Sequence, residues 1–297
     1  MVSPNLSTLK TVTSIYYSGL DIECGDDSTM KKQKSAKTVK RGNRTMIIGL
    51  EGWVNAGKVS TFSVKYLADK LNAKIFGEIP VDEFHDYMLF RPSVTVKEGT
   101  IQSYNPPKNE FFCSKDAKNR QPFVLLLGHE PHRNWPKYAE AVLKVAEKKG
   151  VKRIYTTGGF LADVPHQGAT SVSASTNNEK ILSELKKAEV ELTSYAGPTS
   201  VYSEIMVKAK QKRVDVISLW SPVPIYVAGV YPRAAYRILE KIAQLTGIEL
   251  DLTDLKKKAE TFEAEFQKEV AEQPDMRELI EGYKGRTDRE KEPTYIL

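Results

Sequence analysis

Residues 52–60 read GWVNAGKVS and directly follow the apolar run MIIGLE, which places a candidate phosphate-binding loop after a buried strand. Two departures from the pattern argue against nucleotide binding. Val59 stands where a hydroxyl would hold magnesium, and Trp53 would put a bulky ring in the phosphate cradle. The loop therefore indicates a strand-to-helix turn whose glycines serve its geometry, and we expect no nucleotide or other cofactor. The fixed positions of G-x-x-x-x-G-K-[S/T] are occupied by Gly52, Gly57 and Lys58.

A second stretch, GHEPHRNW, contains imidazoles and a carboxylate of the kind that bind zinc. The zinc-protease helix needs a histidine at position 133, where this chain has Arg133, and Pro131 makes the stretch a loop. The sequence also has no G-x-S-x-G turn for a serine nucleophile and no cysteine with a suitable histidine context. We therefore predict no metal site and assign no catalytic residue.

One group of polar residues fits a ligand site better than either motif. Its members follow the carboxyl ends of predicted parallel strands, which is the edge at which open α/β sheets bind ligands. Acids and imidazoles gathered there could transfer protons, or they could cap neighbouring helices and satisfy loop amides. Both interpretations stay open from the sequence. The residues of this rim are Glu51, Asn55, His129, Glu130, Asp163 and His166.

The elements that position the rim follow from apolar runs that alternate with amphipathic stretches. Strands separated by helices of this length predict parallel βαβ units, and hence an α/β fold built as a three-layer α/β/α sandwich. The strands are predicted at 46–51, 74–80, 123–128, 152–159 and 214–220, with short β-like pieces near 93–97 and 100–104. The helices are predicted at about 56–71, 135–149, 178–188, 197–213 and 228–247.

Four segments of different composition divide the chain. Residues 1–45 read as a disordered leader, 46–256 as one core domain, 257–284 as a charged helical extension, and 285–297 as a flexible tail. The net charge of +6 is concentrated in the leader, where residues 31–44 hold seven basic and no acidic side chains. That run lacks interleaved aromatics and a following nucleic-acid motif, so we do not expect nucleic acid as a partner.

Composition excludes a membrane protein and points to the cytoplasm. No run approaches the ~18 apolar residues that span a bilayer, and the N-terminus lacks a compact apolar segment of the secretory kind. Two cysteines, Cys24 and Cys113, are too few for a disulfide framework and fit a reducing compartment. We therefore expect a cytoplasmic protein with no membrane partner.

Several motifs, in order and with consistent spacing, resemble the proteasome assembly chaperone 2 family over about residues 46–256. They are GLEGWVNAGKVS, LLLGHEPHRNW, GVKRIYTTGGFLADVPHQG, SYAGPTS, ISLWSPVPIYV and LTGIELDLTDL, and they are most similar to the archaeal and bacterial single-chain members. The resemblance implies a mixed, largely parallel sheet between helices, similar to the purine nucleoside phosphorylase class. The residues expected to shape the motifs are Gly52, Gly57, Pro165, Gly197, Pro198, Pro222 and Pro224.

The resemblance also implies a function. Family members tend to self-associate, and the characterised ones assist assembly of proteasome α subunits or bind the proteasome surface. We therefore expect a non-enzymatic homo-oligomer whose partner is the proteasome α subunit. Its partner surface would use the aromatics that dominate interface energetics, although core packing is the alternative role for Trp220. The aromatics are Trp53, Trp135, Trp220 and Tyr226.

The tail contributes a second candidate contact. An apolar tip on a polar tether gains nothing for folding, so Tyr295, Ile296 and Leu297 are candidates for docking on a partner. Some archaeal family members end in a hydrophobic–Tyr–any tripeptide, whereas here the tyrosine is one place early. The competing hypotheses are a small-molecule enzyme that uses Glu51, Glu130, His129 and His166, and nucleic-acid binding through residues 31–44.

Overall fold

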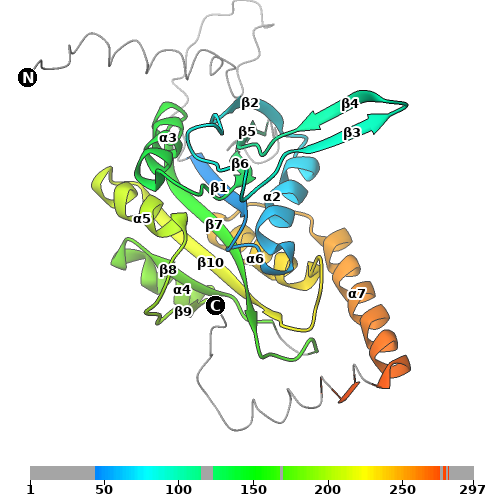
Figure 1. Cartoon of the computed structure of the whole chain (residues 1–297). Helices are drawn as coiled ribbons and strands as arrows, with labels where there is room; N and C mark the ends of the chain where they lie inside the picture. Colours follow the sequence, from blue (N-terminus) through cyan, green and yellow to red (C-terminus); the bar gives the residue numbers. More distant parts are fainter. Residues whose placement is uncertain (1–43, 115–122, 168–169, 275–276, 279, 281–297) are drawn as a thin grey trace, which may run out of the picture.

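An eight-stranded sheet runs through the molecule in the order β2-β5-β6-β1-β7-β10-β8-β9 (Figure 1). The computed structural model describes residues 44–114, 123–167, 170–274, 277–278 and 280. Strands β6, β1, β7 and β10 are mutually parallel, and antiparallel neighbours flank them on both sides. The strands of this sheet are β1 (Arg44–Glu51), β2 (Lys74–Glu78), β5 (Glu110–Cys113), β6 (Phe123–His129), β7 (Val151–Ala162), β8 (Ser173–Thr176), β9 (Glu191–Leu192) and β10 (Asp215–Pro224).

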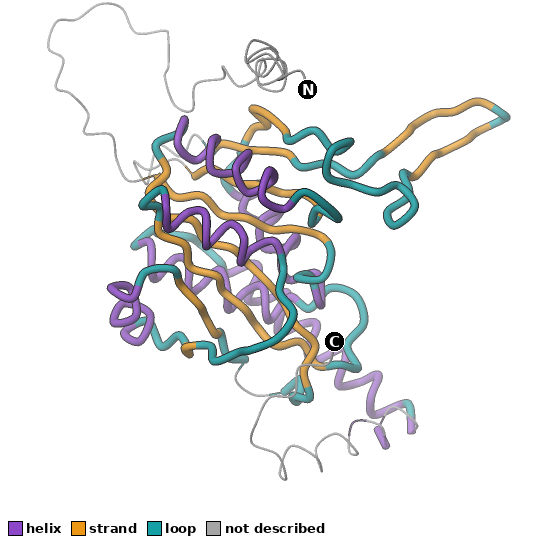
Figure 2. The backbone as a smooth tube through the Cα atoms, turned by 60° about the vertical axis from the view of Figure 1, so that its left-hand side comes forward, coloured by secondary structure: helices purple, strands orange, loops and turns teal. Residues whose placement is uncertain are grey.

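Helices cover both faces of the sheet, as Figure 2 shows. In β1, Met46 and Ile48 face a core shared with α3 and α5, whereas Ile47 faces a core shared with α2 and α6. This alternation of apolar residues toward two cores confirms the predicted three-layer α/β/α sandwich with a mixed, mostly parallel sheet. The helices are η1 (Ala56–Lys58), α2 (Val59–Lys70), α3 (Trp135–Lys148), η2 (Glu179–Ile181), α4 (Leu182–Lys187), α5 (Val201–Gln211), α6 (Pro232–Thr246) and α7 (Thr253–Glu272).

The first helical segment lies directly on β1 and β7 because glycines face it. A Cβ atom on Gly49 would lie 2.3 Å from the Ser60 carbonyl oxygen, and one on Gly159 would lie 2.3 Å from the Ala56 carbonyl oxygen. No real Cβ contact is that short, so both positions require glycine for this packing. The helix therefore seats against the sheet backbone without intervening side chains.

A buried polar network fills the gap where β1 and β7 separate. Their pairing ends at Ile48 and Thr156, so the Leu50 amide has no partner in β7. It donates instead to Ser60 Oγ at 2.9 Å and to the Tyr202 hydroxyl at 3.1 Å. The Thr157 hydroxyl donates to the Ile48 carbonyl at 3.1 Å. Side chains from three elements thus replace a missing strand ladder and satisfy buried backbone groups.

Several element boundaries differ from the prediction for identifiable reasons. The helix predicted at 56–71 is broken, because Gly57 and Lys58 both have a left-handed backbone. The helix predicted at 197–213 begins at Val201, where Ser200 accepts a hydrogen bond from the Tyr202 amide. Pro198 therefore lies ahead of this helix rather than in its first turn.

Strand β10 is longer than the predicted 214–220 and contains two prolines. It pairs with β7 through Pro224 but with β8 only as far as Trp220. Proline cannot donate to a strand ladder, so Pro222 and Pro224 are tolerated where β10 no longer has a neighbour in β8. The two short strands β5 and β9 were not predicted.

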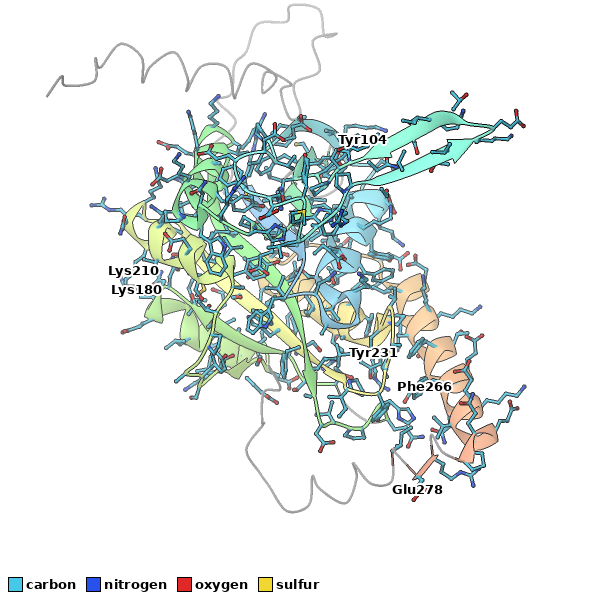
Figure 3. All side chains as sticks on the ribbon, viewed as in Figure 1. Tyr104, Lys180, Lys210, Tyr231, Phe266 and Glu278 are labelled. Atoms are coloured by element: carbon cyan, nitrogen blue, oxygen red, sulfur yellow. The ribbon has the colours of Figure 1, made fainter. Side chains whose placement is uncertain are left out.

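The C-terminal helix α7 packs its apolar stripe onto α6 and the loops beside it. Leu255, Ala259, Phe266 and Val270 are buried, and Phe266 (labelled in Figure 3) stacks on Tyr226 with ring centroids 6.1 Å apart. Helix α7 covers the first part of the charged helical extension expected at 257–284 and ends at Glu272. The predicted leader (except Arg44 and Thr45) and the predicted tail lie outside the described residues.

Two findings concern the expectations about membrane spans and cysteines. No helix in the described part of the chain is long and apolar enough to cross a membrane. Cys113, at the end of β5, is disulfide-bonded, which differs from the expectation that the cysteines stay reduced.

A separate two-stranded hairpin, β3 (Ser93–Lys97) and β4 (Thr100–Asn105), projects from the body beyond the β2–β5 side of the sheet (Figure 1). Every residue of the hairpin strands is exposed except Ser103, which is half-buried.

We predict that Gly49→Ala destabilises the fold by about 2–3 kcal/mol, because the new methyl group would clash with the Ser60 carbonyl oxygen. Urea unfolding monitored by circular dichroism measures the change. Ile47→Val, one residue away in β1, is the control and should cost only about 1 kcal/mol. Equal stability of Gly49→Ala and the wild type would show that the helix does not seat on β1 as described.

Candidate functional site

The loop between β1 and α2 folds its lysine back onto the end of the preceding strand. Lys58 Nζ lies 2.6 Å from Glu51 Oε1, and Asn55 Nδ2 donates to Glu51 Oε2 at 2.7 Å. Asn55 Oδ1 in turn accepts a hydrogen bond from the Thr61 amide at 3.0 Å, which caps the first turn of α2. Lys58 and Asn55 of the phosphate-loop-like stretch therefore both bond to Glu51, and these contacts hold the turn.

Glu130 connects this loop to helix α5. Its Oε2 accepts from the Trp53 amide at 3.1 Å, and its Oε1 accepts from the Val201 amide at 3.0 Å. Burial raises the pKa of the Glu130 carboxyl, and the two backbone hydrogen bonds oppose that rise. One carboxylate thus caps the N-terminus of α5 and fixes the backbone at Trp53.

His129 points away from Glu51, toward the segment that precedes the projecting hairpin. Its ring lies edge-on to Phe90 with centroids 4.4 Å apart, and its amide donates to Asn109 Oδ1 at 3.0 Å. His85 and His132 lie nearby, with ring centroids 5.3 Å apart. No group of three metal-ligating side chains that could hold an ion occurs among the described residues.

His85, which the sequence analysis did not single out, is the most strongly perturbed of these imidazoles. It is 3% exposed, and Asn109 Nδ2 lies 3.0 Å from its Nε2. Asn109 Oδ1 already accepts from the His129 amide and the Tyr138 hydroxyl, so the amide nitrogen must donate and His85 Nε2 must accept. Burial, followed by the neighbouring charges of His132 and His129, lowers the pKa of His85 to about 4.

His166 belongs to a third location, where it holds α7. Its ring nitrogens contact the Tyr226 hydroxyl at 3.1 Å and Gln267 Oε1 at 2.9 Å, and its ring lies edge-on to Phe266. Asp163 is half-buried in the same loop, where its charge contributes to a raised pKa of Tyr226, after burial and Tyr231.

The rim predicted from strand ends is therefore divided among three places. Glu51, Asn55 and Glu130 are brought together around the first loop, and His129 joins the His85 group. Asp163 and His166 lie in the loop after β7, where His166 contacts α7. All six lie at or just after the ends of β1, β6 and β7, but neighbouring residues turn their side chains in different directions. A shared role for them as a ligand rim remains a prediction.

The structure instead places a cavity of about 780 Å³ on the α5 side of the sheet, beside the first loop. This volume lies within the range of roughly 300–1,000 Å³ typical of ligand pockets. The walls come from the first loop, the end of β7, β8, α5 and the segment that precedes it. The lining residues used below are Trp53, Asn55, Tyr195, Met206, Lys210 and Trp220.

Aromatic rings form one wall of this cavity. Trp53 and Trp220 meet edge-on with centroids 6.4 Å apart, and Trp220 Nε1 donates to Ser218 Oγ at 2.9 Å. The Trp220 ring lies over Gly158, where a Cβ would come within 2.5 Å of it. Trp220 is consequently held in place, while Trp53 keeps 51% of its surface exposed.

Charge is scarce in the cavity. Lys210, near the C-terminal end of α5, is the one lining residue with a charged side chain among those the structure describes. Ser and Thr side chains from β8, β10, α5 and the segment before α5 supply most of the other polar groups. The cavity therefore favours an apolar group, with a weak preference for a negative charge nearby.

The sequence analysis identified three of these lining residues, Trp53, Asn55 and Trp220, and missed the wall from β8 and α5. Met206 belongs to no motif, and Tyr195, although it lies in the motif SYAGPTS, was not singled out as a site residue. Their segments meet the first loop only after the sheet has formed. The remaining predicted aromatics are half-buried: Trp135 donates from Nε1 to the Pro131 carbonyl at 2.7 Å, and Tyr226 packs on Phe266.

Comparison with known proteins gives consistent matches across most of the chain. The model of the PAC2 family matches residues 49–270. The uncharacterized protein MJ1210 of Methanocaldococcus jannaschii is 25% identical over 225 residues, covering 74% of this chain and 81% of that protein.

Two solved structures illustrate the likeness. A protein of unknown function from Corynebacterium glutamicum superposes with a TM-score of 0.74 at 25% identity, covering 89% of this chain and 97% of that one. The proteasome-assembly chaperone homologue Rv2125 of Mycobacterium tuberculosis superposes with a TM-score of 0.72 at 25% identity, covering 79% of this chain and 98% of that one.

The pKa of His85 predicts a loss of stability in acid. Because the folded pKa of about 4 lies below the unfolded value near 6.5, unfolding takes up a proton between these limits. Stability from this group is intact at pH 7 and falls by about 3 kcal/mol as the pH drops to 4. Urea unfolding at pH 7 and at pH 4 measures the loss.

Substitution separates His85 from other acid-sensitive groups. His85→Gln should remove most of this pH dependence. His132→Gln, at an exposed neighbour, should leave most of it in place, because burial is the larger cause of the lowered pKa of His85 and His132 contributes only the second. The same loss of stability in both variants would contradict the assignment.

Proposed function

This chain belongs to the PAC2 family, and on that premise we propose that it is a chaperone-like, self-associating protein that binds proteasome α subunits. The likeness to a proteasome-assembly chaperone homologue supports the chaperone-like role. The observation that carries the binding proposal is Trp53, an exposed tryptophan whose backbone the half-buried Glu130 carboxylate holds at the edge of an apolar cavity.

The surroundings of Trp53 suit a binding residue. Its backbone is fixed by Glu130, its ring leans on Trp220, and half of its surface is open to solvent. Tryptophans that are rigid before association lose little conformational freedom on binding, and they are enriched among the residues that dominate interface energies. Trp53 therefore combines the exposure and the rigidity that a partner contact needs.

The cavity beside Trp53 specifies what the partner presents. Its aromatic and apolar walls would receive an apolar side chain of the partner, and Lys210 would favour an acidic residue next to it. Trp135, Trp220 and Tyr226 are half-buried, so in this proposal they support the surface rather than contact the partner.

A small-molecule enzyme is the second candidate, and the volume of the cavity is the observation that favours it. Five of the six rim residues do not line the cavity, and the sixth, Asn55, has its side-chain atoms bonded to Glu51 and Thr61. The arrangement therefore offers a place to bind but no convergent acid and base, which favours the binding role.

We predict that Trp53→Ala weakens capture of proteasome α rings by at least tenfold in Kd, in line with a loss of 2 kcal/mol or more at a central tryptophan. Biolayer interferometry with immobilised α rings measures the affinity. Tyr87→Ala is the matched control, because Tyr87 is also an exposed aromatic but lies in the segment before the hairpin. Equal affinity of the wild type and Trp53→Ala would remove Trp53 from the interface.

The C-terminal tip offers an independent contact, which lies outside the described residues. Removal of residues 294–297 should reduce capture of α rings in the same assay, because it removes the apolar side chains that would dock. Thr294→Ser is the control that leaves Tyr295, Ile296 and Leu297 in place. Unchanged affinity after the deletion would reject a role for the tail and leave the Trp53 surface as the binding site.

A further inference from the structure

The β3–β4 hairpin carries an apolar face that nothing in the described chain covers. Val94, Val96, Ile101 and Tyr104 are 53%, 57%, 67% and 59% exposed. Tyr104 lies near the base of the hairpin, which stands clear of the body (Figure 3). Soluble proteins seldom expose apolar side chains in such a concentrated group unless the group binds something.

All four side chains lie on the same face of the hairpin. The cross-strand pairs Val94–Tyr104 and Val96–Ile101 place them together, since directly opposite residues of an antiparallel pair share a face. The pair Thr95–Ser103 lies on the other face. The hairpin is therefore amphipathic, with one uncharged apolar face and one polar face.

A β-bulge creates this arrangement. Ile101 and Tyr104 are three residues apart, so a regular strand would turn them to opposite faces. The register shifts between Thr95 and Val96, which leaves Gln102 without a partner and brings both side chains to one face. The backbone irregularity thus concentrates apolar surface on one face of a projecting arm.

A hairpin of this kind needs a partner surface for its own stability. Two strands alone are marginally stable in water, and both outer edges of this ribbon are unpaired within the described chain. No helix covers either of its faces in Figure 1. Burial of the apolar face would supply the stabilisation that the rest of the chain does not.

We infer that the apolar face of the β3–β4 hairpin packs against the same face of a second copy of this chain, related by a two-fold axis. The inference rests on the self-association in the proposed function and names the surface that carries it. In a two-fold contact the same patch of both subunits meets, so an ionisable group on the patch would face a like charge. A face without ionisable groups avoids that repulsion. Both charges of the hairpin, Lys97 and Glu98, lie off this face: Lys97 shares the polar face with Thr95, and Glu98 is in the turn.

The available area agrees with a dimer. Met88 and Leu89, in the turn before the hairpin, are 73% and 72% exposed, so a second copy that covers both the hairpin and this turn would meet more apolar surface. With the four hairpin side chains they offer on the order of 700 Å², close to the roughly 800 Å² that each partner buries in a standard interface. The hairpin lies beyond the β2–β5 side of the sheet and the cavity lies near β8, so dimerisation leaves the Trp53 surface open.

The test compares two matched double variants of the hairpin in the full chain. Val96→Glu with Ile101→Glu adds two charges to one cross-strand pair on the apolar face. Thr95→Glu with Ser103→Glu adds two charges to the neighbouring pair on the polar face. Like charges directly opposite weaken a hairpin on either face, so the variants differ chiefly in the face they charge: the apolar face in one, and the polar face, where Ser103 is half-buried, in the other.

Sedimentation equilibrium over a dilution series measures the association constant. We expect the wild type and the polar-face variant to dimerise, and the apolar-face variant to dissociate with a dimer Kd raised by at least a hundredfold. Equal Kd values for both variants, whether raised or unchanged, would overturn the inference. Hydrogen exchange adds a second readout: the hairpin amides of the wild type should gain protection as protein concentration rises, and protection independent of concentration would contradict the contact.

The outcomes separate this inference from the proposed function. A monomeric wild type at every concentration would refute both the proposed self-association and this surface. An oligomer that survives the apolar-face charges would refute the surface alone, and α-ring capture by the same samples reports the proteasome-binding proposal independently.

Discussion

The seating of one helical turn on the backbone of β1 and β7 is the constraint on which the candidate site depends. Gly49 and Gly159 let the backbone of residues 56–60 approach the strands, and Ser60 then completes the hydrogen bonding of β1. At this contact the carboxyl ends of β1 and β7 are separated. The first loop enters the gap between them, where Asn55 forms an isolated parallel β-bridge with Gly159. The position of Trp53 follows from that insertion.

The loop shows how a glycine-and-lysine spacing can serve packing. A phosphate loop directs its amides and its lysine toward the ligand. Here Gly57 and Lys58 turn left-handed, and Lys58 bonds to Glu51 at the end of its own strand. The resulting turn is stabilised internally by ion pair and amide contacts. The turn presents the ring of Trp53 to solvent from a backbone that is held in place.

The layers of the fold could be predicted from the sequence, but the arrangement of the candidate site could not. Long apolar runs such as 123–128 predict buried strands because strands in a parallel sheet are covered on both faces. The same reasoning located the strand ends that carry Glu51, His129 and His166. It could not show that Phe90 and Gln267 draw the two histidines apart, since these neighbours are distant in the sequence. The cavity could not be predicted either, because its walls come from segments that meet only in the folded protein.

The two exposed apolar surfaces differ in how they are supported, and that difference bears on their roles. Trp53 is backed by Glu130, Trp220 and the packed core, so it keeps its geometry without a partner. The hairpin has no comparable support and instead depends on a bulge at Gln102 that gathers apolar residues on one side. A rigid contact suits a partner that binds and dissociates repeatedly, because little conformational entropy is lost on binding or regained on dissociation. A marginally stable hairpin suits a permanent contact, because binding of the partner then stabilises the folded hairpin.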